Sequence, residues 1–348
     1  MHRPIRLLTA VPICDGHDSA INTLNIEFIR HGIEVVYLGF HRSASDIARA
    51  ATQEDVAAVG ISSYNGGHVE FFRDVRKDMD RRGGAHIGLF GGGGGTISQA
   101  DARRMRRQGT DEIFFAGTPL ETIAGFVLKT YGRPRRRPPA KPSRRQASAV
   151  VVGFTGPGGS GKTTLIDELV LRYLHAQPGG RVAVLSHDPS LISEGALLGD
   201  RAMMIHSQHD RVFMRSLATR GQTGGFSTET KHCLDLLRHQ EFELVLVETV
   251  GTGQEAMPFY DGMFDRKILV MHPDYGSRLQ LQKVVMLDAA DIVVVNKSDQ
   301  PRAKAAEMEI GQRLLENGRG QKLVCTEARR HRDQGVDELF RLLTEVAR

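Results

Sequence analysis

Short apolar runs alternate with amphipathic stretches from the beginning of the chain. The runs predict strands, and the stretches between them carry the periodicity of helices. Strict alternation of the two is typical of a parallel sheet covered by helices, which binds ligands at the carboxyl ends of its strands. We therefore expect a doubly wound α/β domain of the flavodoxin kind over residues 1–132. Its predicted strands are 5–11, 34–39, 56–62, 86–90 and 112–115, and its predicted helices are 19–31, one from 45, 68–82, 98–108 and 120–131.

The alternation restarts near residue 149. Several later runs are continuous Val, Ile and Leu, which is typical of strands buried on both faces. A glycine-rich loop leads into a predicted helix at 163–175 with one apolar stripe along it. We expect a second doubly wound α/β domain over 149–348, with predicted strands at 149–154, 182–186, 244–248, 267–272, 292–296 and 322–325.

Residues 133–148, between the two domains, are rich in Arg and Pro and predict a basic, semi-extended linker. Residues 133–147 carry seven Lys or Arg and no acid, and removing those seven from the net charge of +5 leaves −2. The folded parts are therefore near neutral. We expect no nucleic-acid partner, although the pI is about 9.2.

The three cysteines, Cys14, Cys233 and Cys325, are far apart and none has a CxxC partner. This argues against a disulfide framework and against a structural zinc site. The amino terminus has too few apolar residues for a secretion signal, and no run approaches the roughly 18 apolar residues of a membrane span. We expect a soluble protein of the reducing cytoplasm, without a membrane partner.

The loop before the 163–175 helix matches G-x-x-x-x-G-K-[ST] between a predicted strand and a helix, which is the context of a phosphate-binding P-loop. Its glycines let backbone N–H groups point at phosphate oxygens, and the helix adds its positive end. Lys162 would bridge the β- and γ-phosphates, and the Thr163 hydroxyl would bind Mg²⁺. The predicted nucleotide-binding residues here are Gly156, Gly158, Gly159, Ser160, Gly161, Lys162, Thr163 and Thr164.

Asn296-Lys297-Ser298-Asp299 follows another predicted strand and indicates guanine recognition. The Asp299 carboxylate can accept hydrogen bonds from N1–H and from the exocyclic amino group of guanine, a pair that adenine lacks. Asn296 would address the other edge of the base, and Lys297 would pack over its ring. The tetrapeptide therefore favours GTP over ATP as the substrate.

Acidic residues at the ends of two further strands suggest a magnesium site. Glu248 ends a predicted strand, and Gly251 after it can offer an N–H group to the γ-phosphate. Glu248 and Asp188-Pro189 resemble the branch of P-loop proteins that work as nucleotide-gated dimers. That resemblance implies Mg²⁺ ligands at Thr163, Asp188, Asp200, Glu248 and Thr249, and catalytic roles for Lys162, Thr163, Asp188 and Glu248. Asp200 also fits a helix N-cap.

Three segments of the first domain closely resemble the cobalamin-binding pattern DxHxxG, SxL and GG. They are Asp15-Gly16-His17, Ser62-Ser63-Tyr64 and Gly91-Gly92, with Ala20 in place of the final glycine and Tyr64 in place of leucine. Each falls at the carboxyl end of a predicted strand, so the three can meet on one rim of the sheet. A rival interpretation is a bare divalent metal bound by Asp15, His17 and Asp18.

In the cobalamin interpretation the residue types have clear roles. His17 offers a neutral nitrogen as the lower axial ligand of cobalt, and Asp15 holds the other ring N–H group. Ser62 hydrogen-bonds the displaced base of the cofactor. Gly91 and Gly92 leave room for that base inside the sheet, and Gly16 lets the loop approach the corrin.

Together the two halves resemble the amino-terminal portion of the fused isobutyryl-CoA mutases. The resemblance rests on the motifs above and on the first switch Glu194 to Arg201, on Glu248 to Gln254, and on Gln280 and Lys283 in a further switch. The GTPase half is similar to the methylmalonyl-CoA mutase chaperones. The first switch departs from the family by being one residue short, by Ser193-Glu194 and by Met203, which puts its phosphate contacts in question.

The resemblance implies adenosylcobalamin and Mg²⁺ as cofactors and GTP as substrate. Because no acyl-CoA-binding barrel follows Arg348, we expect a large mutase subunit as a separate partner, with an adenosyltransferase and a second copy of this chain as further partners. The main hypothesis is a GTP-hydrolysing metallochaperone fused to an adenosylcobalamin-binding domain. The alternative is a cobalamin-carrying small subunit, or a corrinoid methyl-transfer carrier, with a vestigial GTPase. A cobalamin-sensing regulator fits less well, since the sequence has no DNA-binding helix pair.

Overall fold

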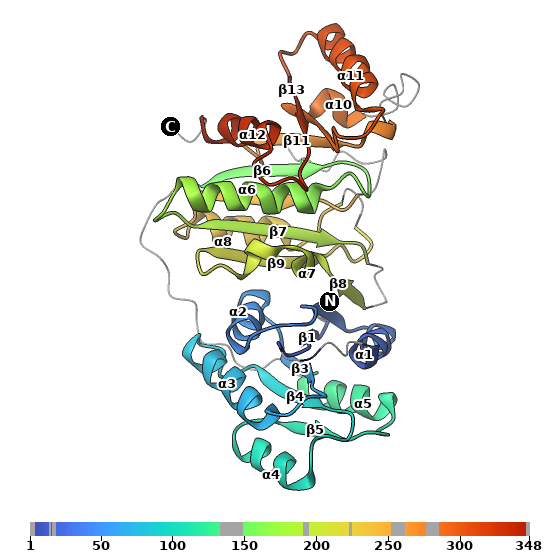
Figure 1. Cartoon of the computed structure of the whole chain (residues 1–348), viewed down its shortest axis with the longest axis vertical. Coiled ribbons are helices and arrows are strands. Elements are labelled where there is room, and N and C mark those ends of the chain that lie inside the picture. The colour runs from blue at the N-terminus through green and yellow to red at the C-terminus, as the bar shows by residue number, and fades with distance from the viewer. Residues whose placement is uncertain are drawn as a thin grey trace. The chain divides into compact units, whose positions relative to one another are not determined.

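The computed structural model describes residues 4–13, 15, 19–132, 149–190, 195–222, 225–251, 262–275 and 285–345. The chain forms two compact units, which we describe separately (Figure 1). The first unit holds the described residues of Met1–Ala140 together with Ser190–Ala202, and the second holds those of Lys141–Pro189 and Met203–Arg348. The sequence predicts a single division at the linker, whereas Ser190–Ala202 returns to the first unit.

Parallel strands form the sheet of the first unit. Its six strands, counted over the described residues, follow the order β5-β4-β3-β1-β2-β8. β1 and β3 are central and buried along their whole length, so the loops that follow them meet at one edge of the sheet. The five predicted strands are β1 (Arg6–Ala10), β2 (Glu34–Tyr37), β3 (Ala58–Ser62), β4 (Gly88–Gly92) and β5 (Glu112–Phe114).

The sixth strand was not predicted. β8 (Ala196–Leu198) belongs to the segment expected in the second domain, and it pairs with the edge strand β2. Three residues are too few to show a period, and the partner strand lies about 160 positions earlier in the chain. β8 is followed directly by the short helix α7 (Asp200–Met203).

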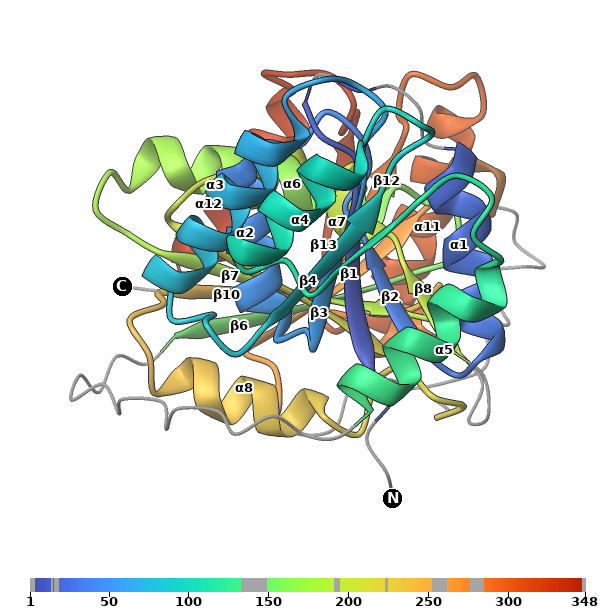
Figure 2. The same cartoon turned by 90° about the horizontal axis from the view of Figure 1, so that it is seen from below.

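Helices cover both faces of this sheet. Figure 2 shows α1 and α5 beside one face and α2, α3 and α4 beside the other. α2 and α4 each begin with a capping box, formed by Ser43 with Asp46 and by Ser98 with Asp101, which satisfies backbone N–H groups that the first turn leaves open. The bounds are α1 (Ser19–Arg30), α2 (Ala44–Glu54), α3 (His68–Arg81), α4 (Gln99–Arg107) and α5 (Leu120–Tyr131).

The core between the sheet and the α1–α5 pair is aromatic. Phe90 on β4 is its centre, with ring centroids of Phe28, Phe114, Phe126 and Tyr131 at 6.0 to 6.4 Å. Edge-to-face and stacked rings at such distances favour one fixed arrangement over many. This rigid core supports the carboxyl ends of β3 and β4.

The second unit has a parallel sheet of seven strands in its described part, in the order β13-β12-β11-β6-β10-β7-β9. The central strands are continuous apolar runs buried on both faces, as their composition predicts. The bounds are β6 (Val150–Thr155), β7 (Val182–Asp188), β9 (Val212–Ala218), β10 (Leu244–Glu248), β11 (Arg266–Met271), β12 (Ile292–Asn296) and β13 (Lys322–Thr326).

One helix of this unit was predicted in detail. α6 (Lys162–Ala176) buries the expected stripe of Leu165, Ile166, Leu169, Val170 and Leu174 against β6 and its neighbours. The other α-helices in the described part of this unit are α8 (Thr230–Arg238), α10 (Val285–Ala289), α11 (Ala303–Asn317) and α12 (Gln334–Thr344). Over the described residues, no helix is both long enough and apolar enough to cross a membrane.

Candidate nucleotide and cofactor sites

The predicted P-loop joins β6 to α6 in the second unit. Gly156, Gly159 and Gly161 have φ angles of 144°, 74° and 87°, a region that side chains disfavour. A Cβ on Gly156 would lie 2.0 Å from the carbonyl oxygen of Val270, and one on Gly161 would lie 2.4 Å from Asn296 Nδ2. Glycine is therefore required here by conformation and by close packing, which agrees with the motif.

Lys162 opens α6 and is buried. Its Nζ donates to the carbonyl oxygens of Gly156 at 3.1 Å and Pro157 at 3.3 Å, so the ammonium group lies inside the loop. Ser160 is fully buried, and its hydroxyl has no hydrogen-bond partner in the described part of the chain. A buried hydroxyl and an inward ammonium at a helix amino terminus fit a bound phosphate.

Two predicted magnesium ligands meet beside the loop. The Thr163 hydroxyl donates to Glu248 Oε1 at 2.9 Å, and Glu248 is buried at the end of β10. Asp188 ends the next strand, β7, which pairs with β10. Hydroxyl and carboxylate oxygens are the donors that Mg²⁺ prefers, so this donor set fits that ion. Over the described residues, no group of three or more His, Cys, Asp or Glu forms a metal cluster.

The other two predicted ligands are placed differently. The Thr249 hydroxyl hydrogen-bonds Thr155 Oγ1 at 3.1 Å and Val250 O at 3.2 Å, within the base of the site. Asp200 opens α7 and belongs to the first unit, not to the unit that carries the P-loop. The second unit by itself therefore brings together Thr163, Glu248 and the strand end at Asp188.

His187 lies under this site and was not predicted. Its Nδ1 donates to the carbonyl oxygen of Glu248 at 2.7 Å, and its Nε2 lies 2.7 Å from the Thr230 hydroxyl on α8. Burial lowers the pKa of His187 to about 4, so the ring is neutral at neutral pH. The imidazole thus ties the ends of β7 and β10 to α8. Its only sequence signal is a histidine before Asp188 in an apolar strand.

The predicted base-recognition residues line a cavity of about 170 Å³ at the ends of β12 and β13. Asp299 accepts a hydrogen bond from Arg329 at 2.7 Å. Asn296 donates to Ser160 O at 2.8 Å and accepts from the Thr326 hydroxyl at 3.0 Å, so its amide joins the P-loop to β13. The lining residues are Gly161, Thr164, Asn296, Lys297, Asp299, Gln300, Glu327, Ala328 and Arg329, of which the last four are not among the predicted residues.

In the first unit, the loops after β1 and β3 are joined by Asp15. This residue is fully buried, and its carboxylate accepts a hydrogen bond from the backbone N–H group of Tyr64. The sequence predicts that Asp15 also accepts a hydrogen bond from the ring N–H group of His17. Gly16 and His17 lie outside the described residues, as does Asp18 of the rival metal interpretation.

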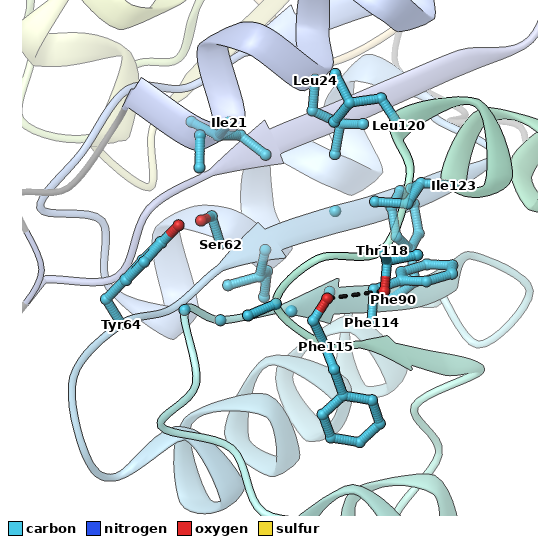
Figure 3. Close-up of a pocket in the computed structure, with 18 of the residues that line it drawn as sticks. Ile21, Leu24, Ser62, Tyr64, Phe90, Phe114, Phe115, Thr118, Leu120 and Ile123 are labelled. Atoms are coloured by element: carbon cyan, nitrogen blue, oxygen red, sulfur yellow. Dashed lines mark hydrogen bonds between the residues drawn. The ribbon is translucent and has the colours of Figure 1, made fainter.

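A cavity of about 290 Å³ lies beside β3 and β4, under α1 and α5 (Figure 3). Its walls are mostly apolar, from Ile21, Leu24, Phe90, Phe114 and Ile123. Figure 3 shows the Ser62 and Tyr64 hydroxyls directed toward one another at one end of the cavity. The Thr118 hydroxyl donates to the carbonyl oxygen of Phe115 at 2.7 Å, so its proton is already used within the protein.

The predicted glycines form one wall of this cavity. A Cβ on Gly91 would lie 2.3 Å from the carbonyl oxygen of Ile61, and one on Gly92 would lie 2.5 Å from that of Phe114. A Cβ on Gly94 would lie 1.9 Å from the ring of Tyr64. An apolar slot with glycine walls and few polar groups fits a flat aromatic base with little hydrogen-bonding capacity.

Known proteins resemble both the amino-terminal domain and the carboxy-terminal domain of this chain. The B12 binding domain family matches residues 5–124. The fused isobutyryl-CoA mutase of Cupriavidus metallidurans is 33% identical over 97% of this chain and 35% of its own length. That of Geobacillus kaustophilus is 34% identical over 89% of this chain and 33% of its own length. This chain thus spans about a third of the length of the curated relatives it matches.

The hydrogenase maturation factor HypB from Archaeoglobus fulgidus has a similar solved structure, with 17% identity, a TM-score of 0.45, and coverage of 58% of this chain and 91% of that one. The family described as methylmalonyl Co-A mutase-associated GTPase MeaB matches residues 141–348, more than half of the chain. The chain therefore belongs to this GTPase family and carries a B12-binding domain before the GTPase domain.

Proposed function

We propose that this protein hydrolyses GTP with Mg²⁺ and uses the reaction to gate the delivery or protection of adenosylcobalamin for an acyl-CoA mutase. The observation that carries the proposal is the Thr163–Glu248 hydrogen bond beside a P-loop whose Lys162 points inward. The B12-binding domain in the same chain supplies the link to the cofactor. The scattered cysteines favour the cytoplasm as the place of this work.

In the nucleotide site, Lys162 neutralises the β- and γ-phosphates, and the loop N–H groups hold their oxygens. Thr163, Asp188 and Glu248 hold Mg²⁺, which supplies positive charge against the charge that develops on the phosphoryl oxygens. Asp200 and Thr249 complete the proposed magnesium surroundings, and the Gly251 N–H group contacts the γ-phosphate. His187 keeps the Glu248 backbone in place through its 2.7 Å hydrogen bond.

The base is held in the cavity at the ends of β12 and β13. We assign guanine selectivity to Asp299, whose carboxylate lines that cavity, with Lys297 over the ring. Because Arg329 already pairs with Asp299 at 2.7 Å, this guanidinium fixes the direction of the carboxylate. Asn296 contributes by fastening the P-loop to β12, through its hydrogen bond to Ser160.

In the first unit, His17 is the proposed cobalt ligand, and Asp15, Gly16, Ser62, Tyr64, Gly91 and Gly92 surround the lower part of the cofactor. Adenosylcobalamin supplies radical chemistry when it is bound. The apolar cavity receives the base of the nucleotide tail, and Ser62 at its end offers a hydroxyl to it. The hydrogen bond from Tyr64 to Asp15 keeps the two rim loops together.

The proposed partner is the acyl-CoA-binding large subunit of a mutase, tested as a separate chain. An adenosyltransferase is the proposed source of the cofactor, and a homodimer is the proposed assembly of the GTPase unit. We assign acyl-CoA isomerisation to the complex with the large subunit, which would supply substrate positioning and exclusion of water.

The purified full chain tests the two activities separately. We expect Mg²⁺-dependent hydrolysis of GTP in preference to ATP, lost in Thr163→Ala and Glu248→Gln and kept in the control Thr344→Ala on α12. Cobalamin binding, followed by absorbance, should be the same in all four proteins. Cobalamin binding without GTP turnover, alone or with a large subunit, would instead identify a passive carrier. Absence of both would reject the proposal.

A further inference from the structure

The β2 edge of the first unit's sheet pairs with a segment that the sequence assigns to the nucleotide site. β8 pairs in parallel with β2, with Glu34, Val35 and Val36 opposite Ala196, Leu197 and Leu198. This strand lies within the expected first switch, between Asp188 at the end of β7 and Asp200 at the start of α7. One segment therefore carries a proposed magnesium ligand and an edge strand of the cofactor-binding sheet.

The backbone of this segment fits its place closely. Gly195 donates its N–H group to Ile29 O at 3.1 Å, and a Cβ on Gly195 would lie 2.2 Å from Ile33 O. At the other end, Arg42 donates to the carbonyl oxygen of Ala202 at 3.2 Å. The contacts thus run along the whole of 195–202.

Arg201 is the most specific contact. Its side chain is fully buried and donates to Glu54 Oε1 at 3.1 Å and to Gln53 Oε1 at 2.6 Å, both at the end of α2. Glu54 is also fully buried and lies 3.8 Å from Arg6. An arginine paired with a prebuilt acidic site selects one register of the segment, because any other register would bury an uncompensated charge.

The strand pairing itself is short. β8 has three residues, of which Ala196 and Leu198 are buried and Leu197 is 49% exposed. A buried ion pair contributes little net stability, since desolvation offsets most of its attraction. The docked segment is therefore specific in register, and its pairing with β2 is confined to three strand residues.

We propose that the β2 edge of the B12-binding unit is the docking surface of the segment 195–202, which contains the described part of the first switch. The inference rests on the proposed function and adds a structural link between the GTP site and the cobalamin-binding sheet. With the nucleotide site empty, the segment is docked on β2 and Asp200 is held in the first unit. Binding of Mg²⁺ and GTP draws Asp200 to the metal, which releases β8 and opens the edge of the cofactor-binding sheet.

Because docking and metal binding compete for one segment, a change that stabilises docking should weaken the binding of Mg²⁺ and GTP. A change that weakens docking should strengthen that binding. A disulfide between Val35→Cys and Leu197→Cys would hold the docked state, since these residues are opposite each other and neighbouring strands lie ~4.8 Å apart, within disulfide reach. Arg201→Met would weaken docking. We expect the oxidised disulfide to lower GTP turnover about tenfold, reversibly with reductant, and Arg201→Met to raise GTP affinity.

Matched controls separate this effect from damage. The two single-cysteine variants control for oxidation, and Arg76→Met, an arginine on α3 paired with Asp80, controls for loss of an ion pair in the same unit. A purely structural role for Arg201 predicts weaker binding in Arg201→Met, which is the opposite sign. In the wild-type chain, a non-hydrolysable GTP analogue should speed amide exchange in β2 and β8 and leave β1 and β3 protected.

The outcomes are distinguishable. Equal turnover in the oxidised and reduced disulfide variant, with unchanged exchange in β2 and β8, would overturn the docking inference while GTP hydrolysis by the wild-type chain upholds the proposed function. If the disulfide variant does not fold, the amide-exchange measurement on the wild type decides alone. A wild type without GTP hydrolysis would overturn the proposed function itself.

Discussion

Lowering the pH should decrease the folding stability of the second unit, because His187 is buried as the neutral ring. The buried ring is neutral when it donates to Glu248 O, and burial lowers its pKa from 6.5 to about 4. Between those values the unfolded chain binds a proton that the folded chain does not. The contribution of the neutral His187 ring to the free energy of unfolding is therefore fully present above pH 6.5 and is lost as the pH falls toward 4.

The magnitude follows from the shift. One pKa unit corresponds to about 1.4 kcal/mol. The full difference is then about 3 kcal/mol, of which about 2 kcal/mol is lost between pH 7 and pH 5. Other groups titrate in the same range, so the quantity to compare is the pH dependence of the wild type minus that of His187→Gln, which can keep hydrogen bonds but does not titrate there.

Amide exchange in β10 of the full chain, without nucleotide, reports the free energy of opening around this histidine. We expect the wild type to lose about 2 kcal/mol more than His187→Gln between pH 7 and pH 5. The variant should be less stable than the wild type at pH 7, because Gln fits the space between Glu248 and Thr230 less well. Parallel pH profiles for the two proteins would refute the assignment of a buried neutral imidazole.

Three further substitutions test the binding sites. His17→Ala should leave GTP binding intact and change the cobalamin absorption spectrum, and an unchanged spectrum would exclude axial ligation by this residue. Gly91→Ala should weaken cobalamin binding more than tenfold, because its Cβ would lie 2.3 Å from Ile61 O, whereas Gly125→Ala, with open space around it, serves as the control; equal affinities would place the base elsewhere. Asp299→Asn should shift preference from GTP toward xanthosine triphosphate, and a wild type that binds both equally would refute the guanine assignment.

The parts of the fold that the sequence predicted are those with local causes. Alternating apolar runs and helices predict the parallel sheets, and the P-loop glycines are needed for φ angles that the loop itself imposes. Gly91 and Gly92 are predicted to leave room for the base of the cofactor, and their role in cofactor binding stays a prediction; their close contacts with Ile61 O and Phe114 O show that the packing leaves no space for a side chain at either position.

The features that the sequence did not predict depend on distant partners. β8 forms a strand because it can pair with the edge strand β2. Arg201 can be buried because Glu54, 147 positions away, accepts a hydrogen bond from it and compensates its charge. Asn296 is predicted to address the base, and nothing in the sequence indicates that its amide also bonds Ser160 and Thr326, neither of which is near in sequence. His187 likewise gains its role from Glu248 and Thr230. No periodicity marks such residues, because their partners are brought together by the fold.

The central claim is that GTP turnover serves a cobalamin-dependent mutase. The most direct measurement is GTP hydrolysis and acyl-CoA isomerisation in one mixture of the full chain, adenosylcobalamin and a mutase large subunit. We predict that the large subunit raises GTP turnover and that isomerisation is sustained with GTP but declines with a non-hydrolysable analogue or with Lys162→Ala. GTP turnover that ignores the large subunit, together with isomerisation that is the same with GTP and with the analogue, would contradict the account.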